Sequence, residues 1–179
     1  AAHVRFSEAE AILSAVALLS RAYALLLAAP TGRAETNVAM GAVACATVGG
    51  TMAPGQAIEL GQAPGDAPSV RSVHARKTAS LFTMVARLAC LCGNATGDVA
   101  GQVVDYASRL GVAYQIVDDV QDRSSPGEAR ANLARVVGVE PSRSLARDEI
   151  RAGRVAAQVD GTGNLGALLD WLEQELDSA

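Results

Sequence analysis

The sequence has few aromatic residues. Phe, Trp and Tyr make up 3% of its 179 positions, whereas 50% of all residues are hydrophobic. The core must therefore be built from Ala, Val and Leu, a composition that suits closely packed helices better than a β-sandwich. A chain of this length can bury a substantial core without disulfides or a structural metal. We predict an all-α protein that folds as a single domain over residues 1–179.

Charged residues are scarce as well, at 19%, and the formal net charge is −4. No stretch of the chain is strongly basic, and no stacking aromatic residues lie near its arginines. Nucleic-acid binding needs a basic surface, and this chain has none. We therefore expect no nucleic-acid partner.

Cysteine is limited to Cys45, Cys90 and Cys92, an odd number. Cys90 and Cys92 would point to different sides of a helix, so their spacing does not favour a joint role for the two thiols. A free cysteine usually behaves as a small buried hydrophobic residue. We expect these three in the core and assign them no chemistry.

No basic leader precedes the longest apolar stretch, residues 11–29, and Glu8 and Glu10 come just before it. This is unlike a secretory signal, so we expect cytoplasmic localisation. The stretch is nearly long enough to span a bilayer, but Arg21 lies at its centre. We interpret it as a buried helix and expect no integral membrane segment.

Glycine and proline divide the chain into helical segments. Ser7 and Glu10 have the spacing of a capping box at the start of the first helix. Residues 56–69 are rich in Gly and Pro, and we expect a loop there with at most one short helical turn. The expected helices cover 7–29, 35 to the Gly-rich segment 49–55, 70–92, 98–122, 127–138, 142–159 and 164–176.

Three carboxylates lie within five positions at the end of the helix expected over 98–122: Asp118, Asp119 and Asp122. Helical spacing puts Gln115, Asp118 and Asp122 on one face, with Asp119 beside them. Burying unpaired carboxylates is costly, and Arg123 alone cannot neutralise three. Magnesium takes oxygen ligands and bridges carboxylates to substrate phosphates. The cluster indicates a metal-bound diphosphate at the mouth of a helical bundle; a solvated helix end is the alternative.

Lys77 is the only lysine among fifteen basic residues. A compact ammonium meets a phosphate differently from a guanidinium, so a site that needs a point charge would retain lysine. Thr78, beside it, can donate a hydroxyl to the same anion. The alternative is a surface lysine whose stem lies along the bundle.

Several segments resemble the trans-isoprenyl diphosphate synthases, or polyprenyl synthetase family. "GVAYQIVDDVQD" (111–122) is similar to the family's second aspartate-rich motif, DDxxD after an aromatic-Gln pair. "KTASLF" (77–82) resembles its KTxxLF segment, and "GQAIEL" (55–60) resembles GQxxDL, with Glu59 in the acidic position. "VRFSEAEAILSAVALL" (4–19) and "NLARVVG" (132–138) extend the resemblance over essentially the whole chain.

The resemblance implies an isoprenoid synthase helical bundle around a central apolar cavity. In that family Mg²⁺ assists ionisation of an allylic prenyl diphosphate, and isopentenyl diphosphate attacks the resulting carbocation. The resemblance also implies a homodimer or a heteromer with another synthase subunit. Carried over to this sequence, the metal ligands would be Asp118 and Asp122 with Asp119 assisting; the substrate contacts would be Lys77, Thr78, Gln115 and Gln56; and the catalytic residues would be Lys77, Asp118 and Asp119.

The sequence also departs from the family pattern. Its 179 residues contain no second DDxxD, and the family's first aspartate-rich motif would lie upstream of residue 1. Three interpretations stay open: a longer enzyme with an N-terminal segment, a catalytically incomplete partner subunit of a heteromeric synthase, and a class I terpene cyclase. The third lacks its usual Asn-Ser-Glu triad, because Val136 stands four positions after Asn132. Product length is not encoded in the segments present.

Overall fold

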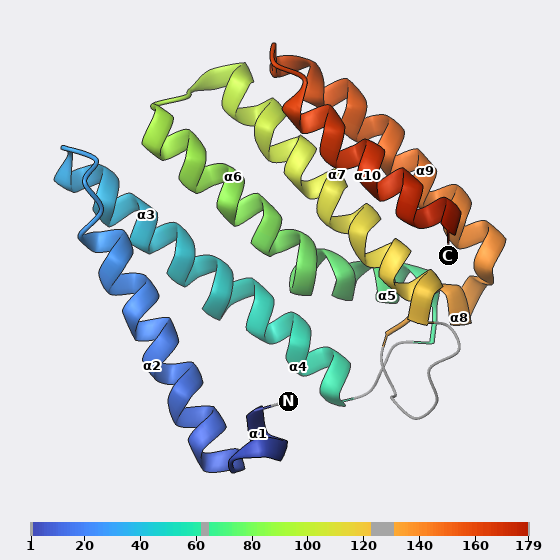
Figure 1. The fold of residues 1–179 in the computed structure, drawn as a ribbon, viewed down its shortest axis with the longest axis horizontal. Coiled ribbons are helices and arrows are strands. Elements are labelled where there is room, and N and C mark those ends of the chain that lie inside the picture. Colours follow the sequence, from blue (N-terminus) through green and yellow to red (C-terminus); the bar gives the residue numbers. More distant parts are fainter. Residues whose placement is uncertain (1, 62–64, 123–130, 179) are drawn as a thin grey trace. The chain divides into compact units, whose positions relative to one another are not determined.

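The computed structural model describes residues 2–61, 65–122 and 131–178, and these residues form helices and turns with no β-strand (Figure 1). The prediction of an all-α protein is confirmed. The α-helices are α1 Ala2–Arg5, α2 Glu8–Leu27, α3 Ala34–Thr47, α4 Ala53–Gly61, α5 Ala67–His74, α6 Ser80–Gly93, α7 Gly97–Gln121, α8 Leu133–Val137, α9 Val139–Ala156 and α10 Asn164–Ser178. The described residues also include two π-helical turns, η1 Val48–Met52 and η2 Ala75–Ala79, and a 3₁₀ turn, η4 Ala157–Val159.

The chain divides into two compact units, 1–44 and 45–179. The N-terminal unit holds α1, α2 and most of α3, and the C-terminal unit holds the rest. The expectation of one domain over the whole chain stays a prediction.

In the N-terminal unit, α2 begins at the expected capping box. The Ser7 hydroxyl accepts from the Glu10 backbone N–H at 3.1 Å and donates to the Glu10 carboxylate at 2.7 Å. The predicted burial of this helix is wrong, because none of its residues is buried. In its own unit α2 packs mainly on the short α1, which cannot cover a 20-residue apolar helix.

Two described helical stretches, 8–27 and 34–61, are long and apolar enough to cross a membrane by length and composition alone. Core helices of soluble proteins also meet this test, so it is weak support for a membrane segment. The expected lack of an integral membrane segment stays a prediction.

The expected end of the second helix at residues 49–55 is wrong, because α3, η1 and α4 run on from Ala34 to Gly61. The backbone N–H of Ala53 donates to the Val48 carbonyl five residues back, which makes this turn wider than an α-helical one. Pro54 then falls in the first turn after it, where proline is tolerated. The predicted loop over 56–69 is therefore wrong for residues 56–61 and for 67–69, which belong to the next helix, and 62–64 lie outside the described residues.

The helix expected over 70–92 consists of α5, η2 and α6. Asp66 caps α5 by accepting from the Ser69 N–H at 2.9 Å, and this hydrogen bond lowers the pKa of Asp66. Asn94, in the left-handed conformation at φ 55°, ends α6. Of the helix expected over 127–138, residues 133–137 are helical, and 127–130 lie outside the described residues.

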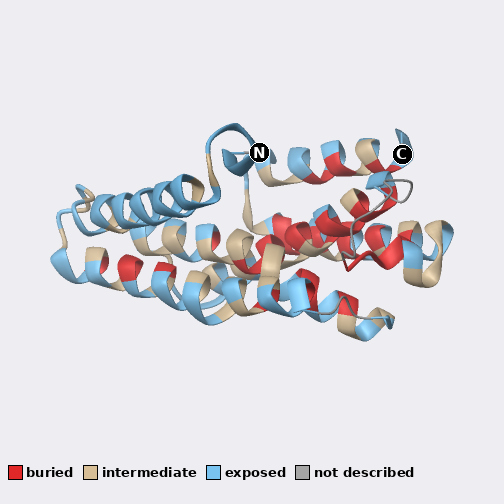
Figure 2. Ribbon diagram, turned by 90° about the horizontal axis from the view of Figure 1, so that it is seen from below, coloured by how far each residue is buried: buried red, intermediate tan, exposed pale blue. Residues whose placement is uncertain are grey.

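The C-terminal unit is organised around α7, which packs against α6, η2, α8, α9 and α10. Helices α6, α7, α9 and α10 lie side by side (Figure 1). Most buried residues belong to this unit (Figure 2). Its core is aliphatic, as the composition indicates, and includes Val70, Ile116, Leu133, Ile150, Leu169, Leu172 and Leu176, all at most 1% exposed. The cysteines do not join it: Cys45 and Cys92 are exposed and Cys90 is half-buried, so that expectation is wrong.

A buried carboxylate ties three helices of this unit together. Glu149 of α9 pairs with Arg71 of α5 at 2.9 Å and with Arg109 of α7 at 3.0 Å. Both arginines are more exposed than Glu149, so the carboxylate is neutralised from the surface side. The network fixes α5, and with it the following turn η2, against α7.

Candidate active site

Lys77 and Thr78 lie in the π-helical turn η2 between α4 and α7. The Ser80 N–H donates to the Ala75 carbonyl five residues back, which widens this turn. The Ser80 hydroxyl also donates to the Arg76 carbonyl at 2.5 Å. Such turns are rare and frequent at functional sites. The two predicted substrate-binding residues therefore share an unusual backbone segment.

Lys77 contacts the segment 55–60 through Glu59. Its Nζ lies 2.7 Å from Glu59 Oε2, and the Gln56 amide donates to the same oxygen at 2.9 Å. The Glu59 side chain is 5% exposed, whereas that of Lys77 is 26% exposed. The structure thus brings Gln56 and Lys77 together around a buried carboxylate. Glu59 was noted in the sequence only for its acidic position, and its role as the Lys77 partner emerges from the fold.

Thr78 contacts the aspartate-rich segment. Its hydroxyl donates to Gln115 Oε1 at 2.7 Å. The Gln115 amide, itself buried, donates to Asp118 Oδ2 at 3.2 Å and to Asp119 Oδ1 at 3.4 Å. Two segments that lie 37 residues apart in sequence are therefore joined by side-chain hydrogen bonds.

Asp119 faces the interior rather than the solvent. It is 3% exposed, and its Oδ2 accepts from the Leu133 N–H at 2.6 Å and lies 3.2 Å from Nε2 of His74. The Asn132 amide donates to the Asp119 carbonyl at 3.0 Å. These bonds tie the end of α7 to the start of α8 and to α5.

Burial shifts the pKa values of this buried pair in opposite directions. Burial raises the pKa of Asp119 to about 7, against the lowering effect of the Leu133 N–H and the nearby Lys77 charge. Burial lowers the pKa of His74 to about 4. His74 is therefore neutral at pH 7, and its contact with Asp119 is a hydrogen bond donated by Nε2–H.

Sequence reasoning did not predict His74. His74 lies among the buried residues Val70, Val73 and Ala79 on a helix expected to be apolar. A buried imidazole requires a hydrogen-bond partner, so a histidine at this position was the available signal. The contact of Asp119 with the Leu133 N–H has no such signal in the sequence, because every residue other than proline carries a backbone N–H.

The remaining carboxylates are more accessible. Asp118 is half-buried and Asp122 is exposed at the C-cap of α7. No group of three His, Cys, Asp or Glu side chains is arranged to hold a metal ion anywhere in the described part of the chain. The metal-ligand assignment of Asp118, Asp119 and Asp122 thus stays a prediction.

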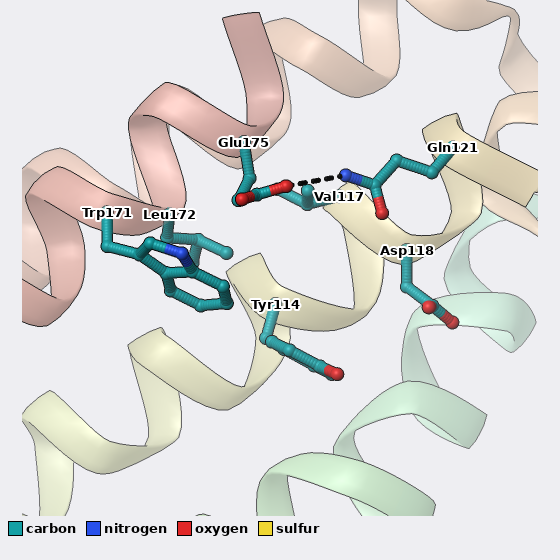
Figure 3. A pocket seen from close by; sticks show the side chains of 7 residues that line it. All are labelled: Tyr114, Val117, Asp118, Gln121, Trp171, Leu172 and Glu175. Atoms are coloured by element: carbon teal, nitrogen blue, oxygen red, sulfur yellow. Dashed lines mark hydrogen bonds between the residues drawn. The ribbon is translucent and has the colours of Figure 1, made fainter. Parts of the chain in front are cut away.

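Asp118 also borders a small pocket between α7 and α10, with a volume of about 130 Å³ (Figure 3). Tyr114 and Trp171 form its aromatic walls, and Gln121 donates to Glu175 at 3.2 Å across its rim. Asp118 therefore faces a pocket lined by both aromatic and polar side chains.

A larger apolar cavity of about 480 Å³ lies between α6, α7 and α10. It begins one helical turn after Lys77 and Thr78, at Leu81 and Phe82. The Phe82 ring, which lines this cavity, lies 5.8 Å from the Tyr114 ring, which lines the pocket that Asp118 borders. The remaining lining residues are Val85, Ala86, Ala89, Val103, Tyr106, Ala107, Leu110, Leu165 and Leu168. A polar site thus adjoins an apolar cavity.

The model of the polyprenyl synthetase family matches residues 1–132, which include all of the predicted site residues. The chain belongs to the polyprenyl synthetase family. The family resemblance stated from the motifs is confirmed.

Individual relatives agree with this family assignment. The chain is 31% identical to the farnesyl diphosphate synthase of Escherichia coli over 195 aligned positions, which cover 96% of this chain and 65% of that enzyme. It is 26% identical to the heterodimeric geranylgeranyl pyrophosphate synthase large subunit 1 of Arabidopsis thaliana, covering 85% of this chain and 47% of that protein.

Solved structures share the fold. An FPP/GFPP synthase from Zymomonas mobilis superposes with a TM-score of 0.80 at 26% identity, over 98% of this chain and 62% of that one. A geranyltransferase from Legionella pneumophila gives a TM-score of 0.83 at 20% identity, again over 98% and 62%, which shows the fold alone. The chain spans less than two thirds of the length of each of these four proteins.

Proposed function

We propose that this chain takes part in prenyl transfer, the condensation of an allylic prenyl diphosphate with isopentenyl diphosphate. The observation that carries the proposal is the hydrogen-bonded connection from Thr78 through Gln115 to Asp118. It joins the turn that bears the sole lysine to the aspartate-rich segment. A diphosphate with a bound cation needs both a positive group and carboxylates within reach, and the two segments supply them.

Each predicted residue has a role in this proposal. Lys77, Thr78 and Gln115 bind diphosphate oxygens, and the positive charge of Lys77 stabilises the charge that develops on the leaving group. Gln56 contributes through Glu59: its amide donates to the carboxylate that pairs with Lys77. The adjoining apolar cavity accepts the prenyl chain.

The donor set suits magnesium, because it consists of carboxylate oxygens. Asp118 accepts from Gln115 through one oxygen, and Asp122 is exposed, so both have oxygens accessible to a cation. Asp119 Oδ2 already accepts from the Leu133 N–H, so Asp119 is the secondary metal ligand and Asp118 and Asp122 are the main ones. Bound Mg²⁺ would supply Lewis acidity toward the leaving diphosphate.

The test is turnover of allylic and isopentenyl diphosphates with Mg²⁺ by the purified full-length protein. Lys77→Ala or Asp118→Ala should reduce the rate at least about 100-fold, the scale for a lost charge-stabilising group. Arg87→Ala and Asp98→Asn are controls of matching charge, exposed on α6 and α7, and should leave it unchanged. Equal rates in all four variants would refute the roles of Lys77 and Asp118.

A second candidate function is that of a catalytically incomplete partner subunit. Its support is the similarity to a protein named as the large subunit of a heterodimeric synthase. On this proposal the isolated protein binds Mg²⁺ and diphosphate but turns over only with a second synthase subunit. Turnover by the protein alone would dismiss it.

Homodimer formation and cytoplasmic localisation also stay proposals, drawn from the family resemblance and from the sequence. A class I terpene cyclase gains no support from the described residues, where Val136 lies in the short helix α8 in place of a metal ligand. Analytical ultracentrifugation of the purified protein would decide between monomer and dimer.

A further inference from the structure

The turn η2 presents two neighbouring residues to two different helices. Lys77 pairs with Glu59 of α4, and Thr78 donates to Gln115 of α7. Both contacts are shorter than 2.8 Å, so the η2 backbone must lie close to both helices at once.

Glycine stands at the point of contact on each side. A Cβ added to Gly55 of α4 would lie 2.7 Å from the Arg76 Cβ and 3.0 Å from the Lys77 backbone nitrogen. A Cβ added to Gly111 of α7 would lie 2.7 Å from the Ala79 Cα and 3.0 Å from a Phe82 ring carbon. Each set includes a backbone atom, the Lys77 nitrogen or the Ala79 Cα, and Arg76 Cβ is fixed to the backbone, so these atoms cannot rotate away as the end of a flexible side chain can.

We propose that Gly55 and Gly111, here called the glycine pair, are positioning residues of the diphosphate site. By lacking a side chain they let α4 and α7 close on η2 from two sides, which sets where the Lys77 ammonium and the Thr78 hydroxyl lie. The inference rests on the proposed function, because it concerns the same diphosphate site. Their effect is transmitted through Lys77 and Thr78, and neither glycine is assigned a contact with substrate.

The chain offers matched controls. Gly61 of α4 and Gly101 of α7 have no atom within 4 Å of an added Cβ. Gly153 of α9 is a control for packing loss, since its added Cβ would meet Leu169 at 3.3 Å between α9 and α10. Alanine at Gly153 strains the core without touching η2.

The first measurement uses Lys77 as a chemical reporter, because it is the only lysine in the sequence. Its acylation rate with an N-hydroxysuccinimide ester, followed by mass spectrometry, depends on how firmly Glu59 holds the ammonium. Gly55→Ala should raise this rate at least about threefold, because moving η2 from α4 breaks a 2.7 Å ion pair. Gly61→Ala, Gly101→Ala and Gly153→Ala should leave it within about twofold of the parent.

The second measurement is binding of inorganic pyrophosphate with Mg²⁺ by calorimetry, at a temperature where every variant is folded. Gly55→Ala and Gly111→Ala should each weaken binding at least about tenfold, because each displaces a hydrogen-bonding group from a charged anion. Gly153→Ala should lower the midpoint of thermal unfolding and keep the parent affinity. A loss of affinity that follows stability, including a loss in Gly153→Ala, would overturn the inference.

The two failures are distinguishable. If the parent binds pyrophosphate and the glycine-pair variants bind it equally well, the positioning inference is wrong while the proposed function stands. If the parent does not bind pyrophosphate with Mg²⁺, both are wrong. Binding by the parent that falls only in Gly55→Ala and Gly111→Ala supports both.

Discussion

Replacing Asp119 tests whether its carboxylate is an internal anchor, as its contacts indicate. It is 3% exposed and receives the Leu133 N–H at 2.6 Å and the His74 Nε2–H at 3.2 Å. Asp119→Ala would leave the buried Leu133 N–H without an acceptor, and His74 Nε2 would keep only the Ala131 carbonyl at 3.5 Å. An orphaned buried donor costs about 1–3 kcal/mol, so the free energy of unfolding should fall by at least that amount.

The control is Asp118→Ala, one position earlier on the same helix. Asp118 is half-buried and accepts from Gln115, so its loss should cost no more than about 1 kcal/mol of unfolding free energy. Urea denaturation followed by circular dichroism, in metal-free buffer, measures both. The two variants should therefore separate clearly: Asp119→Ala loses stability, whereas Asp118→Ala loses pyrophosphate binding. Equal losses of stability would refute the anchor role of Asp119.

Four further predictions follow from the same contacts. Burial lowers the pKa of His74 to about 4 from 6.5, so the stability due to neutral His74 is present above pH 6.5 and is lost as the pH falls toward 4. The neighbouring Asp119, whose pKa is raised to about 7, contributes in the opposite direction, because its stability is lost as the pH rises through 7. His74→Gln should remove the first contribution and leave the second, so stability in urea denaturation should fall more steeply with rising pH in the variant than in the parent between pH 4 and 7, and equal pH slopes would contradict it. Glu59→Gln should raise the acylation rate of Lys77, because it removes the carboxylate 2.7 Å from the ammonium; an unchanged rate would show that the ion pair does not form in solution. Leu169→Ala should cost about 2–5 kcal/mol in the same denaturation assay, since Leu169 is fully buried; the neighbouring Leu168, 48% exposed, is its control, and equal costs would argue against the packing of α10. Gly101→Ala should add about 0.5–1 kcal/mol of stability, as expected at an open helical position, and a loss would mean that the site is not open.

The sequence indicated the fold where local signals and burial agree. The Ser7 capping box and the long apolar pattern of α7 both predicted helices that the structure contains. The sequence failed at Gly49, Gly50 and Pro54, because propensity cannot register that a π turn changes the hydrogen-bond spacing there. The exposure of α2 also escaped prediction, since apolar composition alone does not say what covers a helix.

The candidate site was predicted in part. Motif positions indicated Lys77, Thr78 and Gln115, and the structure joins Thr78 to Gln115 directly. The separate role of Asp119 could not be predicted, because consecutive carboxylates differ only in the direction of their side chains, which the tertiary contact to Leu133 decides. The same holds for Glu59, whose contact with Lys77 depends on the close approach of α4 and η2.

The most direct test of the central claim, that Lys77 and Asp118 bind one diphosphate together with Mg²⁺, is calorimetric titration of the full-length protein with inorganic pyrophosphate. Binding should require Mg²⁺, protect Lys77 from acylation, and fall at least about tenfold in both Lys77→Ala and Asp118→Ala, since each removes a charged contact. Arg87→Ala should bind like the parent. Pyrophosphate binding that is independent of Mg²⁺, or that survives both substitutions unchanged, would contradict the claim.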